Sequence, residues 1–65
     1  MTLGEKLREV RKSKNMTKQE LAIALNVPKD RIKLYEIGEE NPSEFYLTSF
    51  INYFNIPEED IMSLK

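Results

Sequence analysis

The chain has 65 residues and a formal net charge of −1, and it contains neither cysteine nor histidine. A chain this short forms one small domain, so we expect a single domain over residues 1–65. Without thiols or imidazoles it lacks the usual zinc ligands, any disulfide framework and the commonest nucleophiles and bases. We therefore expect no metal site, no cofactor and no enzymatic activity. No apolar run is long enough for a signal peptide or a membrane span, so we expect a cytoplasmic protein without a membrane partner.

Charge is distributed unevenly along the chain. Residues 1–33 contain nine of the ten basic residues and four acidic ones, whereas residues 34–65 contain one basic and seven acidic residues. A basic half can attract phosphate even when the net charge of the domain is negative. The alternative is that these charges only keep an ordinary surface solvated.

The first two helices follow from apolar spacing and from a capping signal. Leu3, Leu7 and Val10 recur at helical spacing between polar residues, which predicts a helix over about residues 2–14 with one buried stripe. Thr17 and Glu20 have the spacing of a capping box, in which each side chain bonds the other residue's backbone N–H. A second helix is therefore predicted over residues 18–25.

Two similar segments mark the later turns. Asn26–Asp30 and Asn55–Glu59 each read Asn, a β-branched residue, Pro, a charged residue and an acid. Asn tolerates the left-handed conformation that ends a helix, and Pro has a φ angle suited to the first turn of the next helix. Together with Gly38 and the Pro42–Ser43 pair, these turns delimit three more helices, over about residues 29–37, 43–55 and 57–63.

No segment alternates for long enough to predict a strand, so the sequence indicates an all-α domain of five helices. The apolar residues on the inward faces of these helices form the expected core: Leu7, Val10, Leu21, Leu25, Val27, Ile32, Leu47, Phe50, Phe54 and Ile61.

Four stretches carry a family resemblance over nearly the whole chain. In chain order they are LGEKLREVRKSKNMT, TKQELAIALNV, IKLYEIGEENPS and FINYFNIPEEDI. Their combined spacing resembles the DNA-binding domain of Cro and phage-repressor type regulators, the xenobiotic-response-element family. The resemblance implies a compact five-helix domain in which residues 18–25 and 29–37 form a helix-turn-helix. It also implies a prokaryotic or phage transcriptional regulator, a repressor that binds double-stranded DNA as a homodimer on a two-fold site.

The resemblance assigns the helix over residues 29–37 to the DNA major groove. At about 100° per residue, Ile32 and Tyr35 of this helix point to the core. Its outward face or edge carries the residues at the base-reading positions, which are Lys29, Asp30, Lys33 and Leu34. Lysine can donate to guanine, aspartate can accept from cytosine, and leucine can contact a thymine methyl. The alternative is a charged helix face with no ligand.

Other positions are candidates for the DNA backbone, with Lys18 at the start of the second helix first among them. Arg31 and Asn41 are weaker phosphate candidates. Against DNA binding, Glu39 and Glu40 place two carboxylates in a loop where relatives often carry basic or polar residues.

Three outward apolar residues support a different function. Ile23, Leu34 and Ile37 would form a contact surface in a protein-interaction module that keeps the fold and has weak or lost DNA binding. A protein partner is therefore the alternative to DNA.

An arginine near the end of the first helix often pairs with a glutamate near the end of the third in this family, and Arg11 and Glu36 match those places. We expect a structural ion pair; the alternative is a phosphate contact by Arg11.

The helix over residues 43–55 is rich in aromatic residues. Leu47, Phe50, Ile51 and Phe54 form one stripe, which indicates core rather than a stacking platform for single-stranded nucleic acid. On another face we expect partly exposed tyrosines, and the candidate dimer contacts are Tyr46, Tyr53, Met62 and Leu64. The alternative is that these side chains only cover the core.

Overall fold

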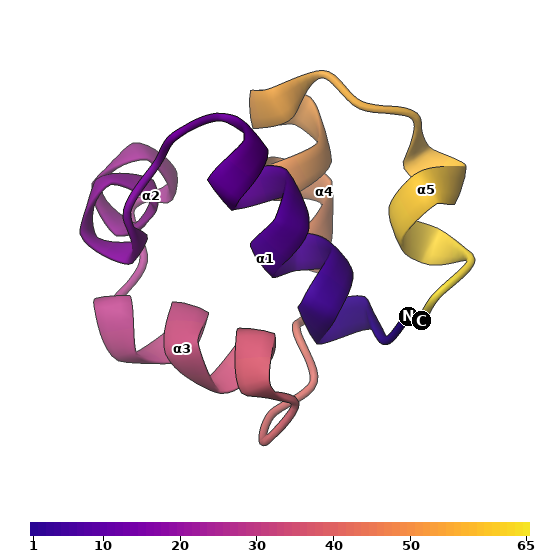
Figure 1. The fold of residues 1–65 in the computed structure, drawn as a ribbon, viewed down its shortest axis with the longest axis horizontal. Helices are drawn as coiled ribbons and strands as arrows, with labels where there is room; N and C mark the ends of the chain where they lie inside the picture. Colours follow the sequence, from indigo (N-terminus) through magenta and orange to yellow (C-terminus); the bar gives the residue numbers. More distant parts are fainter.

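The computed structural model describes all 65 residues and contains five helices and no strand. The helices are α1 (Leu3–Ser13), α2 (Lys18–Leu25), α3 (Lys29–Ile37), α4 (Glu44–Phe54) and α5 (Glu58–Met62). Figure 1 shows α1 between the α2–α3 pair on one side and α5 on the other, with α4 behind it. The predicted all-α architecture and the five helix ranges are confirmed, within one or two residues at each end. None of the helices combines the length and the apolar character needed to cross a membrane.

Capping boxes fix the start of α1 and of α2. The Glu20 backbone N–H donates to Thr17 Oγ1 at 3.0 Å, and the Thr17 N–H donates to the Glu20 carboxylate at 2.8 Å, as predicted. Thr2 and Glu5 make the same reciprocal bonds at the start of α1. This box was not predicted from the sequence, although its Thr-x-x-Glu spacing is identical. Bonds from the backbone and side chain of Thr2 hold the pKa of the Glu5 carboxyl below its usual value.

Left-handed residues end three of the helices. Asn26 has a φ of 56° after α2, Gly38 has a φ of 83° after α3, and Asn55 has a φ of 54° after α4, as expected for these turn signals. Pro28 and Pro57 are the N-cap residues of α3 and α5 and have extended backbones. The predicted start of α3 at residue 29 is therefore confirmed, whereas the last helix was expected from residue 57 and starts at Glu58.

One core joins all five helices. Its buried hydrophobic side chains are Leu7, Val10, Leu21, Ala22, Ile32, Tyr46, Leu47, Phe50, Phe54 and Ile61. Eight of the ten predicted core residues are among them. Leu25 and Val27 are only half-buried and pack against the cluster, because they lie at the α2–α3 turn where the core reaches the surface.

Tyr46 corrects one expectation. Its side chain is only 4% exposed, and its ring lies 4.7 Å from the ring of Tyr35 and 6.0 Å from that of Phe50, measured between centroids. This burial raises the pKa of the Tyr46 hydroxyl. Tyr46 is therefore a core residue and offers no surface to a second copy, whereas Tyr53 is half exposed.

A buried ion pair attaches α3 to α1. Arg11 Nε donates to one Glu36 carboxylate oxygen at 2.7 Å, and Arg11 Nη2 donates to the other at 3.0 Å. Arg11 Nη1 donates to the Met16 carbonyl at 2.7 Å, so the same guanidinium also holds the turn before α2. Arg11 is 5% exposed and Glu36 is 8% exposed. The predicted pair is present, and the hydrogen bonds to Glu36 raise the pKa of Arg11.

The backbones of α1 and α3 meet at Gly4. A Cβ atom placed on Gly4 would lie 2.5 Å from the Tyr35 carbonyl oxygen and 2.6 Å from the Glu36 carbonyl oxygen. Only glycine permits this approach, because both oxygens belong to the α3 backbone and cannot move without the helix. The position of α3 against α1 is therefore fixed at the start of α1 by Gly4 and near its end by Arg11.

The contact at Gly4 predicts that Gly4→Ala destabilises the protein although alanine has the higher helix propensity. We expect a loss of about 1–3 kcal/mol in the free energy of unfolding, measured by urea denaturation, because the added methyl group overpacks the α1–α3 contact. Gly38→Asn is the matched control, since Gly38 has open space around it and asparagine tolerates a positive φ. A Gly4→Ala variant as stable as the wild type would contradict the close approach.

The buried pair predicts that Arg11→Ala and Glu36→Ala each cost about 3–5 kcal/mol, because each leaves an uncompensated buried charge. The double variant should cost less than the sum of the two, since neither charge then remains. Stabilities are measured by urea denaturation with an osmolyte present, because a loss of this size approaches the total stability of so small a domain. Additive losses would show that the two side chains do not interact.

Candidate nucleic-acid interface

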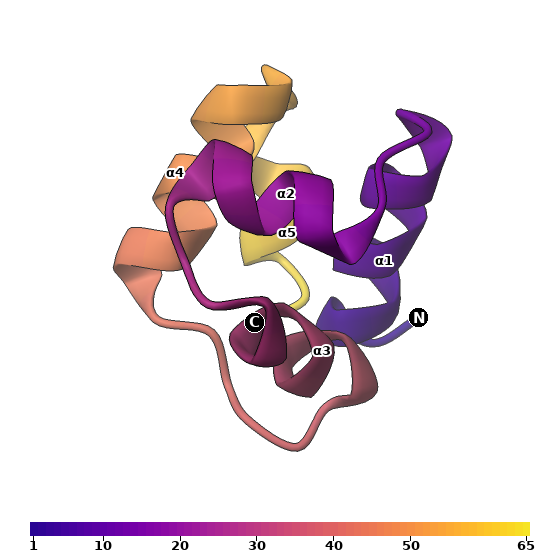
Figure 2. The same cartoon turned by 90° about the vertical axis from the view of Figure 1, so that its left-hand side faces the viewer.

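The outward side of α3 is free of other helices. In Figure 1, α3 lies along the lower edge of the molecule, below α1 and α2. In Figure 2, α2 lies across the view, α3 is seen end-on, and the Asn26–Pro28 turn joins them. Ile32 and Glu36 are buried inward and Tyr35 packs against the core, so the opposite side of α3 is left to face solvent.

The four base-reading candidates all lie on this side of α3 or at its edge. Lys29, Asp30 and Lys33 are exposed, and none of their side chains makes an ion pair or a hydrogen bond within the protein. Leu34 is half-buried and lies at the edge. The structure thus brings together three unpaired polar groups, two cationic and one anionic, on one helix face.

Lys18 lies close to this face from a second element. As the first residue of α2, it lines one hollow with Lys33 of α3 and another with Lys29 of α3. The hollow with Lys33, the α1–α3 hollow, is also lined by Arg8 and Ile37 and by two acidic residues, Glu5 and Glu36. The lysines at the start of α2 and on α3 therefore line two hollows that share Arg8 and Lys18.

The hollow that contains Lys29 carries no acidic residue. We call it the α1–α2 hollow, and its exposed or partly exposed lining residues are Arg8, Lys12, Thr17, Lys18, Gln19 and Lys29. Arg8 and Lys12 were not among the residues predicted for the site. Their spacing of four residues places them on one face of α1, and this was the signal available in the sequence.

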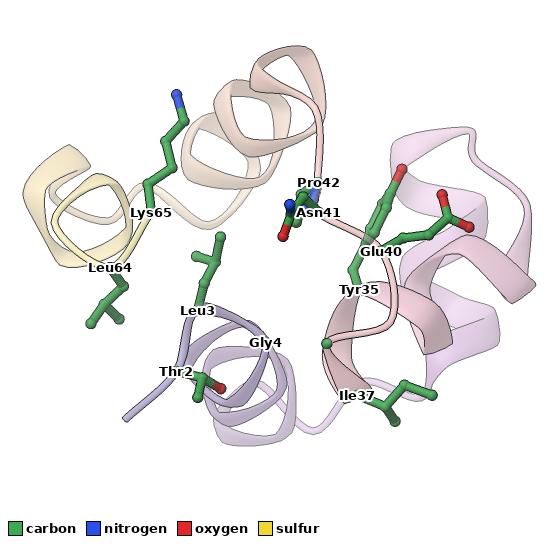
Figure 3. A pocket seen from close by; sticks show the side chains of 11 residues that line it. Thr2, Leu3, Gly4, Tyr35, Ile37, Glu40, Asn41, Pro42, Leu64 and Lys65 are labelled. Atoms are coloured by element: carbon green, nitrogen blue, oxygen red, sulfur yellow. The ribbon is translucent and has the colours of Figure 1, made fainter.

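The other phosphate candidates lie differently. The Arg31 guanidinium is paired with the Glu40 carboxylate, so the loop after α3 neutralises the cation nearest to it. Asn41 is exposed but lines a separate hollow among the start of α1, the loop and the C-terminal residues (Figure 3). Glu39 is exposed and has no ion pair. The loop therefore presents little positive charge, as its sequence suggested.

The exposed apolar residues are dispersed. Ile23 is 70% exposed beside the Asn26–Pro28 turn, and Ile37 lies at the far end of α3 in the α1–α3 hollow. Phe45, at the start of α4, is the most exposed at 79%. The structure does not gather Ile23, Leu34 and Ile37 around one hollow.

Arg11 is not available as a phosphate ligand. Its guanidinium is buried, and three of its nitrogens donate to Glu36 and to the Met16 carbonyl. Arg11 is therefore part of the structural ion pair with Glu36, as predicted, and the alternative of a phosphate contact is excluded. No cluster of acidic side chains that could hold a metal ion is present.

Comparison with protein families agrees with this geometry. A family described as a helix-turn-helix domain matches residues 2–64, which includes all five helices. Searches of curated proteins and of solved structures found no match. Domains of this family typically bind DNA and are not enzymes. The chain belongs to the helix-turn-helix domain family, of the Cro and phage-repressor type.

Proposed function

We propose that this protein is a transcriptional regulator that binds double-stranded DNA sequence-specifically, a repressor that reads the major groove with α3. One observation carries the proposal: Lys29, Asp30 and Lys33 project from α3 without partners, while the inward side of the same helix is fixed to α1. A rigid helix with unpaired donors and an acceptor on its free face suits direct reading of base edges.

Each of these side chains has a base partner in the major groove. Lys29 and Lys33 can donate to O6 and N7 of guanine, and Asp30 can accept from N4 of cytosine. Leu34, at the edge of the face, can contact a thymine methyl group. The half-site we propose therefore contains G·C pairs opposite the two lysines.

Lys18 is the proposed backbone contact at the start of α2, where family members dock on phosphate. Arg31 can also reach phosphate, because its pair with Glu40 is exposed and an exposed pair contributes only about 0–1 kcal/mol. Asn41 is the third phosphate candidate, from the loop after α3.

We further propose that two copies act together in the cytoplasm of a prokaryotic or phage-infected cell on half-sites about one helical turn apart. Tyr53, Met62 and Leu64 remain the candidate dimer contacts, since all three are at least partly exposed. With Tyr46 in the core, this surface is smaller than the sequence suggested.

The exposed apolar side chains support a second candidate function. A protein-interaction module on the same fold would use Ile23, Leu34 and Ile37, of which Ile23 is 70% and Ile37 56% exposed. In that case the acidic loop would face a protein rather than phosphate.

Selection from random-sequence duplexes at two salt concentrations separates the two functions. The regulator predicts enrichment of a palindromic site at both concentrations, with weaker binding at the higher one. Absence of duplex binding even at low salt would reject the regulator and favour the interaction module.

Two lysine variants test how affinity is divided over this surface. Lys18→Ala should weaken binding to all duplexes alike. It should also make the negative slope of log K against log salt concentration shallower by about one. Lys33→Ala should instead relax the preference at one base pair of each half-site, by about 1–3 kcal/mol. Fluorescence anisotropy on the selected site and on its single-base variants measures both effects. Equal losses of specificity in the two variants would contradict the assignment.

A further inference from the structure

The unpaired positive charge of the protein is concentrated in one place. Four ion pairs engage Lys6, Arg11, Arg31 and Lys65. The remaining six of the ten basic residues are Arg8, Lys12, Lys14, Lys18, Lys29 and Lys33. All of these except Lys14 line the α1–α2 hollow or the α1–α3 hollow. These two hollows therefore contain five of the six unpaired cations, and the acidic residues of their lining, Glu5 and Glu36, belong to the α1–α3 hollow alone.

α1 supplies two of these cations. Arg8 and Lys12 are exposed, lie one helical turn apart, and both line the α1–α2 hollow with Lys18 and Lys29. Glu9, the acidic residue between them, is paired with Lys6 at 3.4 Å. The α1–α2 hollow thus receives cations from α1, α2 and α3 and is lined by no carboxylate, whereas Glu5 and Glu9 line a separate hollow that Arg8 and Lys12 also border.

We propose that Arg8 and Lys12 of α1 are DNA-backbone contacts, and that the α1–α2 hollow holds consecutive phosphates of one strand. This inference rests on the proposed function and extends it to a third element. Lys29 connects the two surfaces, because it lines the hollow and also belongs to the outward face of α3. A strand that follows the edge of the groove beside α3 passes the cations of α2 and then those of α1.

The charge of the other end of α3 supports the same docking. There the loop presents Glu39 and Glu40, and its nearby cation Arg31 is already paired. Phosphate is therefore attracted more strongly to the α1–α2 side than to the loop side, where the phosphate candidates Arg31 and Asn41 lie beside two carboxylates. The duplex is held mainly along one edge of α3, and α1 supplies more of the additional positive charge than the loop does.

The variants Arg8→Gln and Lys12→Gln test this assignment, with Lys14→Gln as the matched control. Lys14 is an unpaired, exposed lysine just after α1 and outside both hollows, so it reports the effect of net charge alone. The affinity of the full chain for its selected duplex is measured at salt concentrations from about 0.05 to about 0.3 M, the range in which phosphate contacts dominate the salt dependence of binding. Each hollow variant should lower the salt slope by about 0.9 and weaken binding about eightfold at 0.1 M salt, whereas the control changes binding by less than about twofold.

Duplexes with single neutral methylphosphonates give the second readout. A substitution at the contacted phosphate should weaken binding by the wild type but cost the Lys12→Gln variant little, because the charge pair is already lost. If Arg8→Gln and Lys12→Gln match Lys14→Gln in salt slope and affinity while Lys18→Ala still weakens binding, the inference is overturned and the proposed function stands. Failure of the wild type to bind any duplex would overturn both. Thermal denaturation of each variant checks that the fold is retained.

Discussion

The buried pair of Arg11 and Glu36 is the interaction on which the working surface depends. It joins α1 to α3 by two short hydrogen bonds, and the third bond of the guanidinium reaches the turn that leads into α2. Three elements of the proposed site are thereby set by one side chain. Because a buried pair contributes little net stability when intact and costs much when broken, its role is to specify one arrangement of the helices.

Close backbone contact and charge pairing together leave α3 with two distinct sides. Gly4 brings α1 against the backbone of α3, and Ile32 fills the core below it. On the other side of α3, Lys29 and Lys33 make no ion pair and no side-chain hydrogen bond inside the protein. In a chain this small, most of the inward surface is used for stability. The charges that the fold does not pair are therefore the ones available to a ligand.

Much of this structure could be predicted from the sequence, because the signals are local. The box of Thr17 and Glu20 and the asparagines that end α2 and α4 act within one turn of chain, and their outcome is confirmed. The ion pair of Arg11 and Glu36 is a long-range contact that helical periodicity could not predict, and its prediction rested on the family resemblance. Ion pairs such as Arg31 with Glu40 depend on how the loop after α3 folds, and no local pattern specifies that.

The errors have a common physical cause. Tyr46 was expected on the surface because it was grouped with Tyr53 on another face of α4, yet it borders the main stripe and its ring lies against those of Tyr35 and Phe50. Arg8 and Lys12 lie on a basic face of α1 that was not connected with the site, and that face borders the start of α2 in the folded chain. The spacing of four residues was present in the sequence in both cases, but which helix lies beside each face depends on the tertiary fold.

The central claim is that one surface, made by α3, the start of α2 and the exposed face of α1, binds DNA. Titration of isotopically labelled protein with its selected duplex, followed by amide chemical-shift changes in NMR spectra, tests this claim most directly. The account predicts large changes at Lys18, Lys29 and Lys33 and along the exposed face of α1, with α5 unaffected. Changes centred on α4 and α5, or on the loop after α3 alone, would contradict it.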